Sequence, residues 1–267
     1  ELLNIVIVGG GATGIEVAGI LSEMKKFVLP NDYPDMSSSL MHIYLIEAGP
    51  RLLAGMSEES SAHAEQFLRE MGVNILLNKR VVDYRDHKVV LEDGTEIATR
   101  TFIWVSGVTG VTIGNLDASL IGRGGRIKVD SFNRVEGMNN VFAIGDQCIQ
   151  LADENYPNGH PQLAQVAIQQ GELLAKNLIR MEKGQEMKPF HYRNLGSMAT
   201  VGRNRAVAEF SKVKMQGWFA WVMWLVVHLR SILGVRNKVV VLLNWVWNYF
   251  TYDQSMRMIV YARKAKE

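Results

Sequence analysis

The sequence predicts an α/β fold built on a Rossmann-like nucleotide-binding sheet, followed by a C-terminal amphipathic helical region. Two observations lead to this fold class. A β-branched run at residues 4–8 ends in a glycine-rich turn, and a stretch of helical composition at 14–26 follows it. Beyond residue 210 the chain changes to apolar, tryptophan-rich runs with helical spacing.

The remaining elements follow from composition and turn signals. Residues 31–39 contain a proline and three serines, which favours a loop, and Asp93-Gly94 is typical of a hairpin turn. Strands are expected at 4–8, 41–47, 74–77, 80–84, 88–91, 96–98, 101–105, 126–130, 140–144, 196–202 and 205–210, and helices at 14–26, 57–71 and 162–181. This order predicts a nucleotide-binding sheet with an antiparallel addition. It also predicts that the chain passes from one domain to the next near residue 107.

Composition narrows the class of protein. The 267 residues are 48% hydrophobic and 21% charged, which suits a globular chain of two compact units. The single cysteine, Cys148, cannot form an internal disulfide, and the scattered histidines predict no metal site. The first residues lack the pattern of a signal peptide, so we expect a cytoplasmic chain.

A dinucleotide-binding turn is predicted where the first strand ends. Its residues fit the pattern G-x-G-x-x-G and are Gly9, Gly10, Gly11, Ala12, Thr13 and Gly14. Gly9 would allow the tight turn, Gly11 the approach of a pyrophosphate, and Gly14 the packing of helix on strand. The alternative is a purely structural glycine turn.

An acidic residue, Glu47, ends the second predicted strand. A carboxylate at this place can bind both ribose hydroxyls and would repel a 2′-phosphate, so NADH is preferred over NADPH. The alternative is an exposed glutamate at a strand end.

Two later segments suit a second phosphate-bearing cofactor. Gly145-Asp146 follows a strand-like run, and the aspartate could accept a hydrogen bond from a ribityl hydroxyl. The helix start at 164–170 could direct backbone N–H groups toward the edge of a reduced flavin. An ordinary turn and a polar helix face are the alternatives.

These motifs, together with the strand end at 104–108, occur in an order that resembles the type II NADH dehydrogenases. That family consists of FAD-containing NADH:quinone oxidoreductases with two dinucleotide-binding domains and a membrane-anchoring C-terminal region. The resemblance implies that Gly9–Gly14 and Glu47 hold NADH, and that Glu16 lies beside the nicotinamide. It also implies that Asp146 contacts FAD and that the segment from Ala164 to Gln169 lines the isoalloxazine and quinone site.

The resemblance therefore suggests Glu16, Gln165 and Gln169 as catalytic residues, and adds Gly107, Gly145, Ala164 and Gln165 to the cofactor-binding residues. Without it, Glu16 would be an ordinary glutamate in the first turns of a helix. The domains implied are an NAD(H)-binding domain at 1–107, the C-terminal part of an FAD-binding domain at 108–210, and membrane-associating helices at 211–267. The family has a further glycine fingerprint that would precede Glu1, so we expect the FAD half to be incomplete.

The C-terminal region suggests a membrane surface as partner. Residues 203–267 carry eleven Lys and Arg against three Asp and Glu, and five of the six tryptophans lie here. Polar residues interrupt the apolar runs at 217–233 and 239–250, so neither is long enough to span a bilayer. Helices lying in the headgroup region fit better, whereas nucleic acid fits poorly because the region is so apolar. A buried helix pair or a homodimer interface is the alternative.

The functional hypothesis is hydride transfer from NADH to FAD, with two electrons passed on to a quinone at the cytoplasmic face of the cell membrane. One alternative is an isolated NAD(H)-binding module without turnover. The other is a soluble NADH:acceptor flavoprotein with an oligomerising tail. Relatives that reduce disulfides need a pair of redox cysteines, and this chain has only Cys148.

Overall fold

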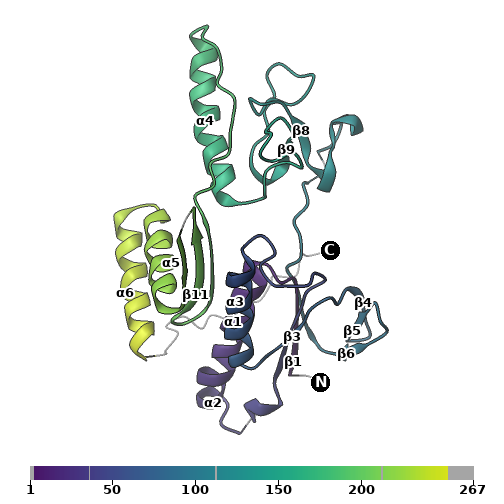
Figure 1. Cartoon of the computed structure of the whole chain (residues 1–267), viewed down its shortest axis with the longest axis vertical. Helices are drawn as coiled ribbons and strands as arrows, with labels where there is room; N and C mark the ends of the chain where they lie inside the picture. The colour runs from purple at the N-terminus through teal and green to yellow at the C-terminus, as the bar shows by residue number, and fades with distance from the viewer. Residues whose placement is uncertain (1–2, 36, 112, 212, 252–267) are drawn as a thin grey trace, which may run out of the picture. The chain divides into compact units, whose positions relative to one another are not determined.

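The computed structural model describes residues 3–35, 37–111, 113–211 and 213–251 (Figure 1). These residues form two compact units. The first contains the described residues up to Ser106 together with those from Gly196 onward, and the second runs from Gly107 to Leu195. This division describes packing, whereas the domains predicted from the sequence were assigned by ligand. The ligand assignment stays a prediction.

The first unit contains a four-stranded parallel sheet. Its order is β3-β2-β1-β7, formed by Val73–Leu76, His42–Ile46, Asn4–Val8 and Thr101–Trp104. The helices α1 (Ala12–Glu23) and α3 (Glu58–Glu70) connect the parallel strands. Ile7 and Leu45 are fully buried in the core of this sheet. The order and the helical crossovers are those of a Rossmann-like fold, as predicted.

The predicted antiparallel addition is also present. It consists of β4 (Val81–Arg85), β5 (Lys88–Leu91) and β6 (Glu96–Ala98). Val89 and Leu91 are buried against the parallel sheet in a small apolar cluster. The segment after α1 differs from its prediction, because a π-helical turn at Met24–Val28 continues into a short helix, α2 (Leu29–Asp32).

A third sheet and a helix pair complete the first unit. The antiparallel strands are β10 (Ser197–Gly202), β11 (Arg205–Phe210) and β12 (Val213–Gln216), and the helices are α5 (Gly217–Ser231) and α6 (Val235–Thr251). Figure 1 shows α5 and α6 side by side next to β11. A Cβ on Gly19 would lie 1.7 Å from Val201 O, so α1 and β10 touch backbone to backbone.

The second unit contains one parallel strand pair and one long helix. The strands β8 (Ile127–Val129) and β9 (Cys148–Gln150) pair in parallel, and α4 spans Ala164–Glu182. Three 3-10 turns lie at Ala118–Leu120, Arg123–Gly125 and Gly145–Gln147. The strand predicted at 140–144 is wrong, because this segment makes only an isolated bridge to Arg134. The buried run at 148–150 takes its place beside β8, whereas Val141 is exposed.

Candidate functional site

The glycine turn between β1 and α1 has the geometry that a phosphate-binding turn requires. Gly9 adopts a φ of +117°, which favours glycine. A Cβ on Gly14 would lie 1.8 Å from Gly9 O, so no side chain fits there. A Cβ on Gly11 would meet nothing within 4 Å, so the turn is open at that residue. Gly14 therefore serves helix packing, and Gly11 faces free space.

The N-terminus of α1 is suited to an anion. Gly11 is the N-cap and supplies no side-chain hydrogen bond, and the first turn contains no acidic residue. Ala12 and Thr13 are exposed. The first N–H groups of a helix have no partner within the helix, and the helix dipole favours negative charge there.

Glu47 lies against this turn. Its Oε2 accepts a hydrogen bond from Gly10 N at 2.6 Å, and its Oε1 accepts one from Gly49 N at 2.7 Å. Each carboxylate oxygen keeps a further lone pair, so two ribose hydroxyls could still bind. The structure thus brings together the fingerprint glycines and the acidic residue, which are 33 or more residues apart in the sequence.

Glu16 lies on the side of α1 that faces β10. Thr200 N donates to Glu16 Oε1 at 3.4 Å. Burial raises the pKa of Glu16 above its ordinary value, although the hydrogen bond from Thr200 and the nearby His228 act in the opposite direction. The neutral, protonated form of this carboxyl is therefore favoured more than in water.

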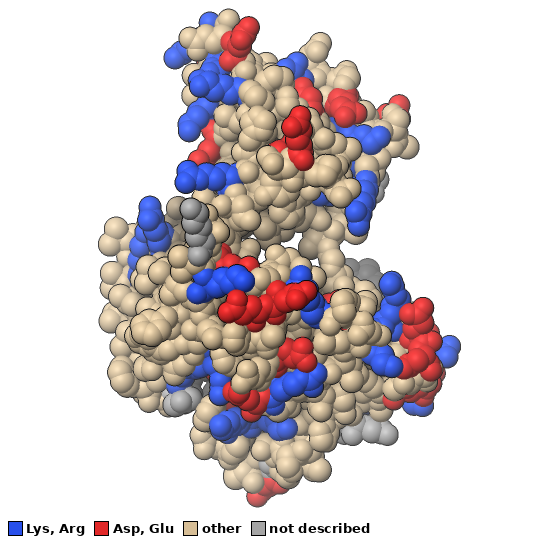
Figure 2. Space-filling model, in the orientation of Figure 1, with Lys and Arg blue, Asp and Glu red and all other residues tan. Residues whose placement is uncertain are grey.

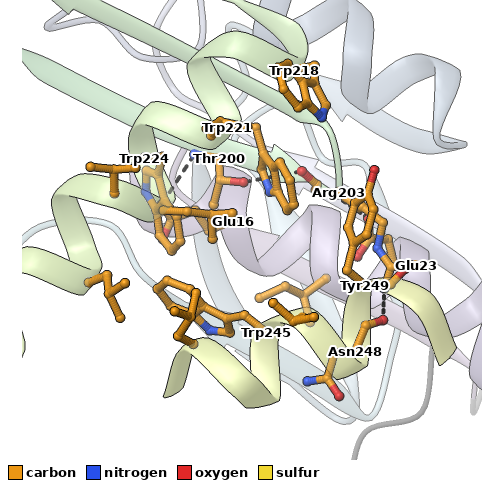
Figure 3. Close-up of a pocket in the computed structure, with 18 of the residues that line it drawn as sticks. Glu16, Glu23, Thr200, Arg203, Trp218, Trp221, Trp224, Trp245, Asn248 and Tyr249 are labelled. Carbon is orange, nitrogen blue, oxygen red and sulfur yellow. Dashed lines mark hydrogen bonds between the residues drawn. The ribbon is translucent and has the colours of Figure 1, made fainter. Parts of the chain in front are cut away.

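A cavity of about 540 Å³ adjoins Glu16 (Figure 3). It is bounded by α1 and β10 on one side and by α5 and α6 on the other. Its walls are mainly apolar and include Trp218, Trp221, Trp224, Trp245 and Tyr249. The sequence predicted the helices of this region but not the cavity, because its walls come from three distant segments.

The other predicted site residues belong to the second unit. Gly145 has a φ of +66° and its N donates to Gln170 Oε1 at 2.7 Å, so the turn is tied to α4. Asp146 is exposed, and its carboxylate has no hydrogen bond within the described ranges. Gln170 is fully buried and was not predicted; its signal in the sequence is its spacing from Val166 on one helix face.

The glutamines proposed as catalytic are bound to the backbone of the second unit. Gln169 Nε2 donates to Arg193 O at 2.9 Å, and Arg193 N donates to Gln169 Oε1 at 3.1 Å. Leu195 N donates to Gln165 Oε1 at 3.1 Å. Both side chains therefore hold the segment after α4 in place, and their catalytic role stays a prediction.

Comparison with known proteins identifies the family. Residues 2–171 match the family described as pyridine nucleotide-disulphide oxidoreductase, which is more than half of the chain. The chain belongs to this family. In this member of the family the one cysteine, Cys148, is buried, and burial raises the pKa of its thiol. A single buried thiol is not a redox dithiol.

The C-terminal part of this family member matches a more specific group. Residues 194–252 match the NDH2 C-terminal domain. Type II NADH:quinone oxidoreductase NdhA of Mycobacterium tuberculosis is 35% identical over 98% of the chain, and Ndh of the same organism is 31% identical over 94%. The chain spans 58% and 55% of these relatives. The resemblance to type II NADH dehydrogenases is thereby confirmed.

A solved structure gives the same fold. NDH2 from Plasmodium falciparum in complex with NADH superposes with a TM-score of 0.85 at 19% identity, covering 96% of this chain and 67% of that one. The predicted α/β nucleotide-binding fold is confirmed. In the described ranges, no helix combines the length and apolar character needed to cross a bilayer.

Proposed function

We propose that this oxidoreductase transfers electrons from NADH through FAD to a membrane quinone. One observation carries the proposal: α1 begins at the glycine turn, and Glu16 on the same helix adjoins the apolar cavity. One short helix therefore links a nucleotide-binding turn to a chamber that suits an apolar acceptor. The relatives named above supply the reaction class.

The glycine turn at the start of α1, together with Glu47, fits NADH. The open space at Gly11 and the unpaired N–H groups of α1 would bind the pyrophosphate. Glu47 would accept hydrogen bonds from the ribose hydroxyls, and its negative charge would disfavour a 2′-phosphate. These residues bind and orient the nucleotide, and Glu16 lies one helical turn further along α1.

The second unit fits part of an FAD site. Gly145 and Asp146 form a tight turn with an exposed carboxylate, and α4 starts at Ala164 with no side-chain cap and no acidic residue in its first turn. Asp146 would accept a hydrogen bond from a ribityl hydroxyl, and the start of α4 would provide N–H donors. FAD supplies the hydride acceptor that passes electrons on in such enzymes.

Glu16 would act on the quinone as an orienting group. Its raised pKa favours the protonated carboxyl, which can donate a hydrogen bond to a carbonyl oxygen. The tryptophan-rich walls would exclude water and accommodate an apolar ring. The cavity thus offers a mainly apolar chamber with the Glu16 carboxyl in its wall.

We also propose that α5 and α6 attach the protein to the cytoplasmic face of the cell membrane. Residues 217–251 contain Arg230, Arg236 and Lys238 but no acidic residue. Apolar side chains are exposed on α6, including Trp247 at 58%. In Figure 2 the surface formed by these helices shows few charged residues. Tryptophan with flanking basic residues suits a headgroup region rich in anionic lipid.

An anaerobic titration tests the electron-transfer proposal. The purified chain is mixed with FAD, separated from free FAD, and its visible absorption spectrum is recorded before and after NADH is added. We expect a retained flavin band that bleaches with NADH. Tight NADH binding without retained flavin would instead identify this chain as a nucleotide-binding module.

Vesicle flotation tests the membrane proposal. We expect the chain to float with vesicles that contain phosphatidylglycerol, and to float less with pure phosphatidylcholine or at high salt. A protein that stays at the bottom and sediments as a dimer would show that the apolar face is an oligomer interface.

A further inference from the structure

We infer that Arg203 is a positioning residue that holds α6 in place as a wall of the cavity and thereby controls access to it. This inference rests on the proposed function only for the identity of the molecule that enters. The attachment of α6 itself is a property of the described chain.

α6 is weakly attached over most of its length. None of its residues is buried, and Leu243 and Phe250 are 63% and 76% exposed. Its aromatic contacts with α5 are Trp224 with Trp245 and Trp221 with Tyr249. A helix that buries so little apolar surface gains little free energy from packing, so directed polar contacts decide its position.

Arg203 supplies such contacts from the turn between β10 and β11. Its Nη1 donates to Tyr249 O at 3.1 Å, and its Nη2 donates to Asn248 O at 2.8 Å. Its guanidinium also lies 5.5 Å from the centre of the Tyr249 ring. The planar guanidinium presents its donors in a fixed fork, so it can reach two neighbouring backbone carbonyls at once.

The arginine is itself anchored to the nucleotide-binding part of the unit. Arg203 N donates to Glu23 Oε1 at 2.5 Å, and Glu23 is the last residue of α1. Figure 3 shows Arg203 close to Glu23, Tyr249 and Asn248. Glu23 and Arg203 line the cavity together with Trp245, so the same contacts that hold α6 also close this end of the cavity.

The other end of α6 has a residue suited to a hinge. Gly234 lies between α5 and α6 with a φ of +81°, and the neighbouring Leu233 and Val235 are highly exposed. Glycine can change its backbone angles at little cost. Loss of the Arg203 contacts would therefore let α6 swing about Gly234 and open the cavity.

Hydrogen exchange of the purified chain tests the inference without cofactor or quinone. Arg203→Met removes the donors, and Arg205→Met is the matched control, because Arg205 lies in the same hairpin but pairs with Glu70 at 3.6 Å. We expect amides at 245–251 to exchange at least about tenfold faster in Arg203→Met than in wild type, as loss of one charge-assisted hydrogen bond would produce. Arg205→Met should exchange like wild type.

A second readout measures access to the cavity. Quenching of tryptophan fluorescence by 2-methyl-1,4-naphthoquinone should become stronger in Arg203→Met than in Arg205→Met. Unchanged exchange and unchanged quenching in Arg203→Met would overturn the inference. If Arg203→Met does not fold, hydrogen exchange of Arg203→Lys tests the inference instead, because a lysine lacks the fork that reaches two carbonyls. Exchange in Arg203→Lys identical to wild type would then overturn the inference. Neither readout depends on flavin binding, so a failure of this inference can be told apart from a failure of the electron-transfer proposal.

Discussion

The carboxylate of Glu47 is bonded to the backbone of Gly10, with 2.6 Å between Glu47 Oε2 and Gly10 N. The residue expected to bind the ribose therefore also holds the glycine turn that is expected to bind the pyrophosphate. Because Glu47 Oε1 accepts from Gly49 N as well, both oxygens are needed as acceptors.

Glu47→Gln should therefore weaken NADH binding and also reduce the preference for NADH over NADPH. An amide has one acceptor oxygen, so either Gly10 or Gly49 loses its partner at a cost of about 1–3 kcal/mol. The lost negative charge should also narrow the preference for NADH over NADPH. Titration calorimetry with both nucleotides measures this, with Glu96→Gln as a surface control. An unchanged preference would contradict the ribose role.

Gly14→Ala should lower the stability of the fold, whereas Gly11→Ala should lower the affinity for NADH. A Cβ on Gly14 overlaps Gly9 O at 1.8 Å, so Gly14→Ala should destabilise the fold by about 1–3 kcal/mol or more. Gly11→Ala meets no atom and should change stability by less than about 0.5 kcal/mol, but should weaken NADH binding. Urea unfolding and nucleotide titration separate the two. NADH affinity that is unchanged in Gly11→Ala would place the pyrophosphate elsewhere.

Glu16→Gln should be stabilising at neutral pH. Burial raises the pKa of Glu16 in the folded state. The contribution of Glu16 to stability is therefore fully present below its unfolded-state pKa of about 4.3, and it is lost as pH rises through its folded-state pKa. Glutamine stays neutral, so the advantage of the variant should grow from pH 4 to pH 7.5 in urea unfolding followed by tryptophan fluorescence.

Glu96→Gln is the control for this pH series. The hydrogen bond from Lys88 lowers the pKa of Glu96, so its contribution is present above the unfolded pKa and is lost as pH falls. The stability of Glu96→Gln relative to wild type should therefore fall as pH rises, whereas that of Glu16→Gln should rise. An advantage of Glu16→Gln that shrinks as pH rises would contradict the buried position of Glu16.

Asp153 and His160 form a buried pair in the second unit, with 3.0 Å between Asp153 Oδ2 and His160 Nε2 and almost no exposure. Burial alone would raise the pKa of Asp153, but the hydrogen bonds from His160 and from the N–H groups of Asn155 and Tyr192 lower it. This contribution to stability is therefore present at neutral pH and is lost as pH falls through the folded pKa.

Asp153→Asn should destabilise the second unit by about 1–3 kcal/mol, because an amide has one acceptor oxygen where the carboxylate accepts from His160 and from two backbone N–H groups. All six tryptophans lie in the first unit, so hydrogen exchange of α4 is the measurement. As a control, Asp93→Asn changes an exposed ion pair with Lys79 and should leave hydrogen exchange of α4 nearly unchanged. Equal exchange in wild type and Asp153→Asn would show that the pair is not structural.

Local pattern was enough to predict most elements of the fold. β-branched runs, the glycine turn and Asp93-Gly94 placed the strands of the parallel sheet and of the antiparallel addition. The strand predicted at 140–144 failed, because short apolar runs are ambiguous until their partner is known. The short strands β9 and β12 were missed for the same reason, since pairing with β8 and β11 defines them.

The candidate site divides in the same way. The sequence by itself predicted the glycine turn and Glu47, because the backbone chemistry of a phosphate-binding turn requires particular residue types at fixed spacing. Glu16 was predicted only through the family resemblance. Only the tertiary structure decided that Glu16 adjoins a cavity between α1 and the C-terminal helices, and that Arg203 donates to the Asn248 carbonyl of α6. Those relationships join residues about 45 to 230 positions apart. They depend on close packing, to which Gly19 contributes by letting α1 and β10 meet, and no local pattern specifies which distant surfaces will touch.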